Sequence, residues 1–96
     1  MKLFLLMYGG PSPERVGAIL ERHDIHEYTT FEGGKGVGRT GKREGSRAWP
    51  GETTMVISIV PRERVDATVA ALEQEAEALP PGERLHVAVL ETERFF

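Results

Sequence analysis

The sequence predicts an α+β protein in which a four-stranded antiparallel sheet carries two helices on one face. Three observations predict this class. Short apolar runs alternate with two segments of helical periodicity, in the order strand, helix, strand, strand, helix, strand. A glycine-rich basic segment without apolar periodicity, residues 33–51, separates the second and third strands and predicts a long loop there. The length of 96 residues is that of one domain, spanning 1–96.

The chain begins with an expected strand and helix. Residues 2–8 are apolar enough for a central strand, and the Gly-Gly-Pro sequence at 9–11 ends it. Ser12 is the expected N-cap of the following helix, with Pro13 at its first position. This helix should end near Asp24. Its apolar face is marked at helical spacing by Val16, Ile19, Leu20 and His23.

The later elements follow from the same patterns. Residues 27–32 are rich in strand formers and predict the second strand, and residues 53–60 predict the third. Pro61 opens the second helix, which the Pro-Pro-Gly sequence at 80–82 ends. Residues 85–91 form the fourth strand. The apolar stripe of the second helix consists of Val65, Val69, Leu72, Ala76 and Leu79.

The order βαββαβ is the split-βαβ, or ferredoxin-like, arrangement. Both faces of the strand 53–60 can be buried: one carries Thr53, Met55, Ile57 and Ile59, the other Thr54, Val56, Ser58 and Val60. The two helices cover only one face of the sheet. We therefore expect another subunit to cover the other face.

Composition excludes several classes of protein. Without cysteine, the chain has no disulfide, no thiolate metal site and no cysteine nucleophile. The apolar run at 2–8 is too short for a signal peptide, and no stretch approaches the roughly 20 apolar residues of a membrane span. The protein is expected to be cytoplasmic. The absence of asparagine and the excess of arginine over lysine indicate a thermophilic or GC-rich source.

The segment 33–51 is the main candidate for function. Five basic residues and one acid give it a charge of +4, so that the rest of the chain carries −7 within a total of −3. A cationic, glycine-rich segment on an acidic body is suited to meeting an anion or an acidic partner. The alternative is a solvated loop whose charges serve solubility. The segment lacks the periodicity of a core helix or strand.

Two nucleotide-binding motifs match the residue pattern of this segment but not its expected secondary structure. Residues 36–41 fit GxGxxG, and residues 36–42 nearly fit a P-loop, but both motifs require a helix directly afterwards and a strand follows here. The glycines can nevertheless expose backbone N–H groups to an anion, and Lys35 and Arg39 would add charged hydrogen bonds. Trp49 either anchors the base of the loop or contacts a partner.

The histidines offer a possible metal site. His23 and His26 lie three residues apart across the expected helix end, and His86 lies in the fourth strand. Two histidines at this spacing chelate a metal if both are helical. The alternative is a helix-terminal His23 and a surface His26. Glutamates at 73, 75 and 77 cannot share one helix face, which argues against a carboxylate site. No nucleophile–base set indicates an enzyme.

The sequence resembles the PII family of nitrogen-regulatory signalling proteins. The resemblance is carried by Lys35-Gly36-Val37-Gly38-Arg39-Thr40 after the second strand and by the return Arg47-Ala48-Trp49-Pro50-Gly51-Glu52, together with the βαββαβ order. It implies a homotrimer that binds ATP, ADP or AMP between subunits, with Lys35, Gly36, Gly38 and Arg39 at the ligand. The exposed loop, called the T-loop in this family, would dock on a transporter or enzyme through Lys42, Arg43, Arg47 and Trp49.

The chain departs from this family pattern at two places. The family has a Gly-Asp-Gly-Lys phosphate-binding turn after the second helix, whereas this chain has Leu79-Pro80-Pro81-Gly82-Glu83-Arg84. The basic pair beyond the fourth strand is reduced to Arg94. A mononucleotide or bicarbonate is therefore a ligand candidate beside ATP. No cofactor is expected, and a role for Mg²⁺ stays open.

Three hypotheses about function follow. The first is a non-enzymatic, ligand-responsive trimeric regulator. The second is a metal-responsive trimer of the CutA cation-tolerance type, which shares this fold and carries a Trp-x-Gly-Glu segment at a comparable place, with His23, His26 or His86 as ligands. The third is an enzyme or nucleic-acid binder. The net negative charge argues against a broad nucleic-acid surface, and the lack of a nucleophile–base set argues against an enzyme.

Overall fold

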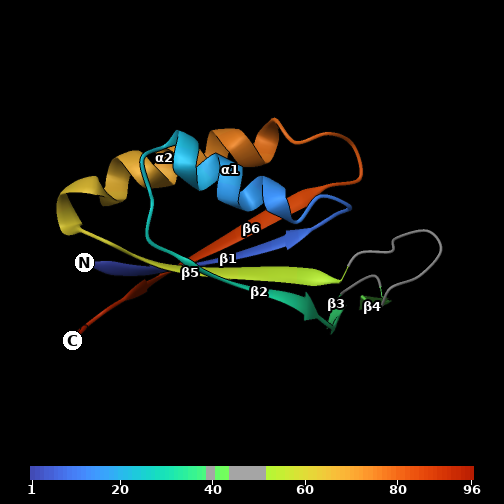
Figure 1. Ribbon diagram of the computed structural model, residues 1–96, viewed down its shortest axis with the longest axis horizontal. Helices are drawn as coiled ribbons and strands as arrows, with labels where there is room; N and C mark the ends of the chain where they lie inside the picture. The colour runs from blue at the N-terminus through green and yellow to red at the C-terminus, as the bar shows by residue number, and fades with distance from the viewer. Residues whose placement is uncertain (39–40, 44–51) are drawn as a thin grey trace.

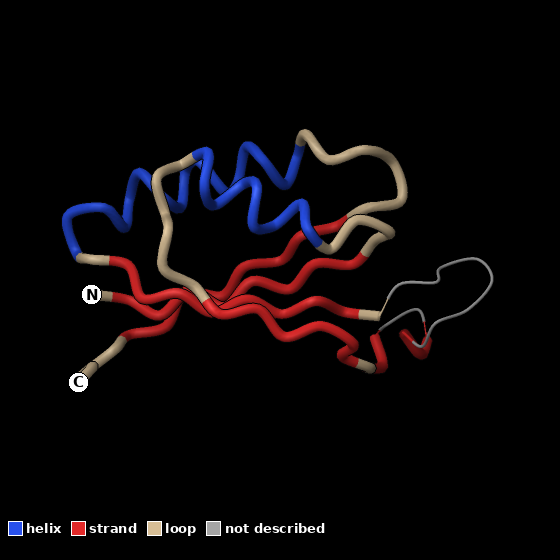
Figure 2. The backbone as a smooth tube through the Cα atoms, viewed as in Figure 1, coloured by secondary structure: helices blue, strands red, loops and turns tan. Residues whose placement is uncertain are grey.

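The computed structural model describes residues 1–38, 41–43 and 52–96, in which both helices lie on one face of a sheet (Figure 1). Figure 2 shows the same two layers by secondary structure. The predicted α+β class and βαββαβ order are confirmed. The elements are β1 (Lys2–Gly9), α1 (Glu14–Arg22), β2 (Thr29–Gly34), β3 (Gly36–Gly38), β4 (Gly41–Arg43), β5 (Thr53–Val60), the 3₁₀ helix η1 (Arg62–Arg64), α2 (Val65–Glu77) and β6 (Arg84–Glu91).

The main sheet has the strand order β2-β5-β1-β6, and each neighbouring pair is antiparallel. The central strand β1 pairs along its whole length with β5 on one side and β6 on the other. Leu5, for example, lies opposite both Ile57 and Ala88. The edge strand β2 pairs only with β5, and β3 and β4 pair with each other in a separate small sheet.

The core lies between the helices and one face of the sheet. Alternate residues of β1 and β5 are buried, as the period-two spacing of strand side chains requires. The predicted helical stripes also point inward: Leu72 is buried, and the rest of the α2 stripe packs against the core. The buried apolar residues are Phe4, Leu6, Tyr8, Val16, Ile19, Leu20, Ile25, Val56, Val60, Leu72 and Leu85. None of the helices in the described ranges has both the length and the apolar character needed to cross a bilayer.

The starts of both helices differ from the sequence prediction. The N-cap of α1 is Pro13, not Ser12, and no side chain caps it. The backbone N–H of Ser12 instead donates a 3.0 Å hydrogen bond to the Tyr8 hydroxyl, which holds Ser12 one residue outside the cap. Pro61 opens the 3₁₀ turn η1, and α2 begins only at Val65.

The second strand runs from Thr29 to Gly34, two residues later than predicted, so the expectation that the whole segment 33–51 lies outside the core sheet is wrong at its first residues. Gly34 pairs with Thr53 after a register shift. A side chain on Gly34 would come within 2.9 Å of the Thr53 carbonyl oxygen, so the absence of a Cβ allows this close approach. Gly33 has φ = +81°, a conformation that favours glycine.

Gly10 provides a test of the packing of the β1–α1 turn against Tyr8 and Glu83. Gly10 is buried, and a Cβ there would overlap the hydroxyl of Tyr8 and lie 3.0 Å from Cγ of Glu83. Gly10→Ala should therefore lower the free energy of unfolding by about 1–3 kcal/mol, the usual cost of overpacking. Gly36→Ala is the matched control, since no atom lies within 4 Å of a Cβ at Gly36. Urea denaturation of both variants measures the difference, and equal stabilities would contradict the packing described.

Candidate functional site

Within the segment 33–51, the strands β3 and β4 form a glycine-rich hairpin at the end of the sheet opposite to η1 and both termini (Figure 1). In this hairpin Gly36 pairs with Arg43, Val37 with Lys42, and Gly38 with Gly41. The structure therefore brings the predicted ligand residues Gly36 and Gly38 beside the predicted partner residues Lys42 and Arg43. Lys35, just before the hairpin, is exposed. The predicted residues Arg39, Arg47 and Trp49 lie outside the described residues.

A small cavity of about 260 Å³ lies between the base of this hairpin and the β1–α1 turn. Gly10, Pro11 and Pro13 line it from the turn, Glu32 and Gly33 line it from β2, and Thr54 of β5 and the preceding Glu52 complete it. The two glutamates flank the basic segment on either side in the sequence. Sequence reasoning attended to the basic residues and missed this acidic pair, which the pairing of Gly34 with Thr53 brings to one place.

A buried carboxylate lies near the same turn. Glu83, in the turn between α2 and β6, accepts hydrogen bonds from the Tyr8 hydroxyl at 2.7 Å and from Nε and Nη2 of Arg15 at 2.6 and 3.1 Å. Its side chain is only 6% exposed. The hydrogen bond from Tyr8, helped by those from Arg15, lowers the pKa of Glu83 below its usual 4.5. Glu83 is therefore an ionised internal anion that ties the turn to β1 and α1.

The cluster of Tyr8, Arg15 and Glu83 includes a residue of the turn at 79–84, where the sequence departs from the PII pattern. Sequence reasoning noted the acid at Glu83 but did not foresee its partners, because Tyr8, Arg15 and Glu83 are separated by up to 75 residues. The Tyr8 hydroxyl and the Arg15 guanidinium thus donate to Glu83 at this turn. Burial is the main cause that raises the pKa of Tyr8, and the neighbouring Glu83 carboxylate adds to it.

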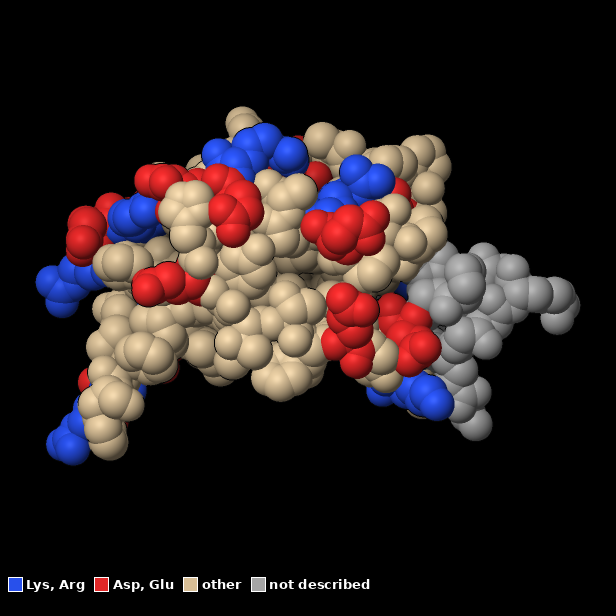
Figure 3. All heavy atoms as spheres, in the orientation of Figure 1, with Lys and Arg blue, Asp and Glu red and all other residues tan. Residues whose placement is uncertain are grey.

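A larger groove of about 880 Å³ lies on the sheet face away from the helices. Its floor is apolar and includes Leu3, Ile57, Ile59 and Leu90, while the connection before β2 and the segment after β6 form its sides. Within the described residues, the hydroxyl oxygen of Thr92 in this groove is buried without a hydrogen-bond partner. In Figure 3, charged side chains of both signs gather over the helix layer, whereas the middle of the sheet layer below is uncharged on the face shown.

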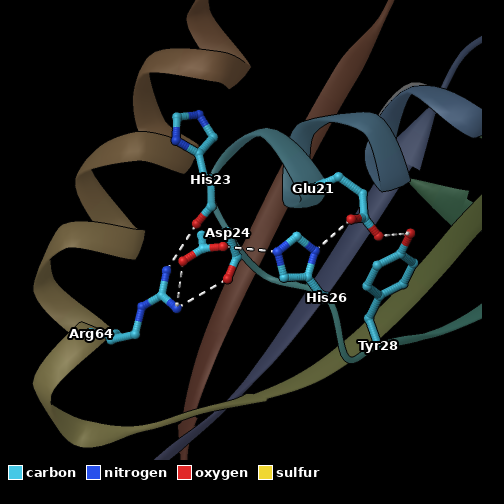
Figure 4. A network of polar contacts seen from close by, with 6 residues as sticks. All are labelled: Glu21, His23, Asp24, His26, Tyr28 and Arg64. Atoms are coloured by element: carbon cyan, nitrogen blue, oxygen red, sulfur yellow. Dashed lines mark hydrogen bonds and ion pairs between the residues drawn. The ribbon is translucent and has the colours of Figure 1, made fainter.

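The three histidines do not converge. His23 Nε2 lies 2.7 Å from Glu75 of α2, while His26 lies between Glu21 and Asp24 (Figure 4). His86 is exposed on β6, opposite Met7, on the open face of the sheet. In the part of the chain that the structure describes, no group of three or more acidic and histidine side chains is arranged to hold a metal ion. The structure gives no support to the metal-responsive alternative.

Comparison with known proteins agrees with this architecture. A model of the family described as Nitrogen regulatory protein P-II matches residues 1–93. The chain belongs to the P-II family. The resemblance seen in the sequence is thereby confirmed, and the chain is placed among regulatory proteins. A comparison with curated proteins finds no match.

Several solved structures of one P-II-like protein, CPII from Thiomonas intermedia K12, share the fold. CPII bound to ADP, AMP and bicarbonate is 23% identical, with a TM-score of 0.63 over 93% of this chain and 86% of that chain. CPII bound to ADP and bicarbonate is 24% identical, with a TM-score of 0.62 over the same shares. The apo form of CPII is 20% identical, with a TM-score of 0.58 over 93% and 87%.

Removing the internal anion tests the cluster around Glu83. Glu83→Ala should lower the free energy of unfolding at pH 7 by about 1–3 kcal/mol, because Tyr8 and Arg15 lose their acceptor. Since the pKa of Glu83 is lowered by folding, its stabilisation is present above about pH 4.5 and is lost as the pH falls through the folded value. The difference between wild type and variant should therefore shrink in acid.

Urea denaturation between pH 3 and pH 7 measures this difference. Glu77→Ala, at an exposed glutamate at the end of α2, is the control and should stay within about 0.5 kcal/mol of wild type. A Glu83→Ala variant as stable as the control at pH 7 would show that the cluster contributes nothing.

Proposed function

We propose that this chain is a non-enzymatic P-II regulator of one domain, spanning 1–96. In this proposal it is a cytoplasmic homotrimer that binds an adenine nucleotide or a small anion such as bicarbonate between subunits. The segment 33–51 then acts on a partner protein. The observation that carries the proposal is the P-II match over residues 1–93, combined with a glycine hairpin that leaves the edge of the sheet where the family resemblance places its regulatory loop.

The ligand class is supported by the neighbours and by the hairpin. CPII, the structural neighbour, binds ADP, AMP and bicarbonate. In this chain the backbone of Gly36 and Gly38 supplies a surface without side chains, and Lys35 and Arg39 supply positive charge for an anion. Lys42, Arg43, Arg47 and Trp49 are then available for an acidic or apolar partner surface.

The turn between α2 and β6 favours a ligand with few phosphates. The PII resemblance places a phosphate-binding turn here, but in this chain Glu83 already occupies the donors of Tyr8 and Arg15. A polyphosphate would have to compete with the Glu83 carboxylate for these donors, since the carboxylate already forms an ion pair with Arg15. We therefore expect AMP, ADP or bicarbonate to bind more tightly than ATP.

The trimer is supported by the open face of the sheet. By strand register, this face presents an apolar surface that the helices do not cover. Phe31, Met55 and Leu90 on it are 51%, 37% and 43% exposed, and contiguous apolar patches of this kind mark protein interfaces. The residues of this surface are Leu3, Leu5, Met7, Phe31, Met55, Ile57, Ile59, Ala88 and Leu90.

Calorimetry tests ligand binding. Titrating the full chain with AMP, ADP, ATP and bicarbonate should give saturable binding near one site per subunit, with ATP weakest. Arg39→Ala should weaken binding by about 1–3 kcal/mol through loss of a charged hydrogen bond. Arg62→Ala, on η1 at the far end of the sheet, is the matched control and should bind like wild type. No heat with any ligand would refute this ligand class, and an unchanged affinity would remove Arg39 from the site.

Light scattering after size exclusion tests the trimer. The wild type should elute with three times the 10.7 kDa mass of the chain. Leu90→Glu should shift it toward the monomer, because burying an unpaired charge in an apolar interface is costly. Ala70→Glu, on the exposed side of α2, introduces the same charge away from the sheet and should leave the trimer intact. A monomeric wild type would overturn the trimer while leaving the ligand test standing.

A further inference from the structure

His26 lies between two carboxylates in the connection from α1 to β2 (Figure 4). Its Nδ1 is 2.5 Å from Oε1 of Glu21, and its Nε2 is 2.8 Å from Oδ1 of Asp24. A neutral imidazole has one N–H donor and one lone pair, and ionised carboxylates only accept. Only the protonated ring can donate to both. With both carboxylates ionised, the two hydrogen bonds are therefore held together only when His26 is protonated.

The surrounding charges reinforce this arrangement. Glu21, on α1, also accepts a 3.3 Å hydrogen bond from the Tyr28 hydroxyl. Arg64 of η1 lies 3.8 Å from Asp24 Oδ2. It also donates to the backbone oxygens of His23 and Asp24 at 2.9 and 3.0 Å.

Neither Glu27 nor His23, the remaining titratable neighbours, bridges the carboxylates of Glu21 and Asp24. Glu27 follows His26 directly, and with Asp24 and Arg64 it lines a separate cavity of about 350 Å³. The ring of His23 points away, toward Glu75 on α2. His26 is thus the imidazole that joins the Glu21 and Asp24 carboxylates.

The connection that His26 holds borders two functional parts of the molecule. Tyr28 packs against α1 where Gly17 leaves room, since a Cβ at Gly17 would lie 3.0 Å from the Tyr28 hydroxyl. Glu27, Tyr28 and Thr29 form one side of the large groove on the sheet. The connection also leads directly into β2, the edge strand that pairs with β5 alone and runs into the segment 33–51.

We propose that His26 is a proton-operated latch, which closes the α1–β2 connection onto α1 when protonated and releases it when neutral. On loss of the proton, one of the two hydrogen bonds disappears, and the ring lone pair then faces a carboxylate. Glu21 and Asp24 also lose the cation between them. The connection remains attached to α1 through Tyr28, to η1 through Arg64 and to β5 through Ser58, whose hydroxyl donates a 2.8 Å hydrogen bond to the backbone oxygen of Glu27. Release therefore loosens residues 26–31 without unfolding the chain.

The direction of the pH dependence follows from the contacts. The hydrogen bond to Glu21 and then that to Asp24 raise the pKa of His26 above its usual 6.5. A raised pKa means that the stabilisation is fully present below about pH 6.5 and is lost as the pH rises through the folded value. The latch is therefore closed below the raised pKa of His26 and opens above it.

Amide hydrogen exchange of the unliganded full chain tests the latch. Protection factors of residues 26–31, corrected for intrinsic exchange rates, should fall about two- to five-fold between pH 6 and pH 8.5, the range that surface ion pairs give. In His26→Gln they should be independent of pH, because glutamine does not titrate. In Glu21→Gln the fall should move to lower pH. His86→Gln, three strands away on β6, is the control and should behave like wild type.

Two results would overturn the latch: protection that does not change with pH in the wild type, or the same change in His26→Gln as in the wild type. If His26→Gln does not fold, the shift expected for Glu21→Gln decides the question. Since no ligand is present, failure of the latch is distinguishable from failure of the proposed nucleotide binding.

Discussion

The fold depends on the central position of β1. This strand is hydrogen-bonded along both edges, to β5 and β6, so its backbone polar groups are satisfied while one of its faces is sealed by the helices. That allows Phe4, Leu6 and Tyr8 to be buried side by side. The other elements are placed by reference to this strand: α1 and α2 pack over it, and β2 reaches the sheet only through β5.

Much of this architecture could be predicted from the sequence because its signals are local. The strand 53–60 was predicted with its correct bounds, since a run rich in β-branched residues lies between the Pro-Gly at 50–51 and Pro61. The cap of α1 was wrong because a tertiary partner intervened: the hydroxyl of Tyr8 binds the backbone of Ser12. The two-residue shift of β2 has a similar cause, since Gly34 gains a place in the sheet only through its close approach to Thr53.

The candidate site was less predictable than the fold. The sequence pattern singled out the glycines and the lysine at 35–38 as candidate ligand residues. It did not indicate the polar clusters around Glu83 and His26. Tyr8, Arg15 and Glu83 come from three different elements, and no spacing in the sequence links them. The sequence suggested His26 as a metal ligand together with His23. Asp24, which lies between them, determines where the two side chains point. Its left-handed conformation, φ = +66°, ends α1 and turns the chain so that the two imidazoles diverge.

The pairing of Gly34 with Thr53 has a consequence for how such a protein can diversify. Because the ladder of β2 and β5 fixes the two ends of the intervening segment beside each other, the segment can lengthen or shorten without displacing the body. Each doubling of a flexible loop costs only about 0.6 kcal/mol in closure entropy. Changes in the length of this segment can therefore arise almost independently of the stability of the core.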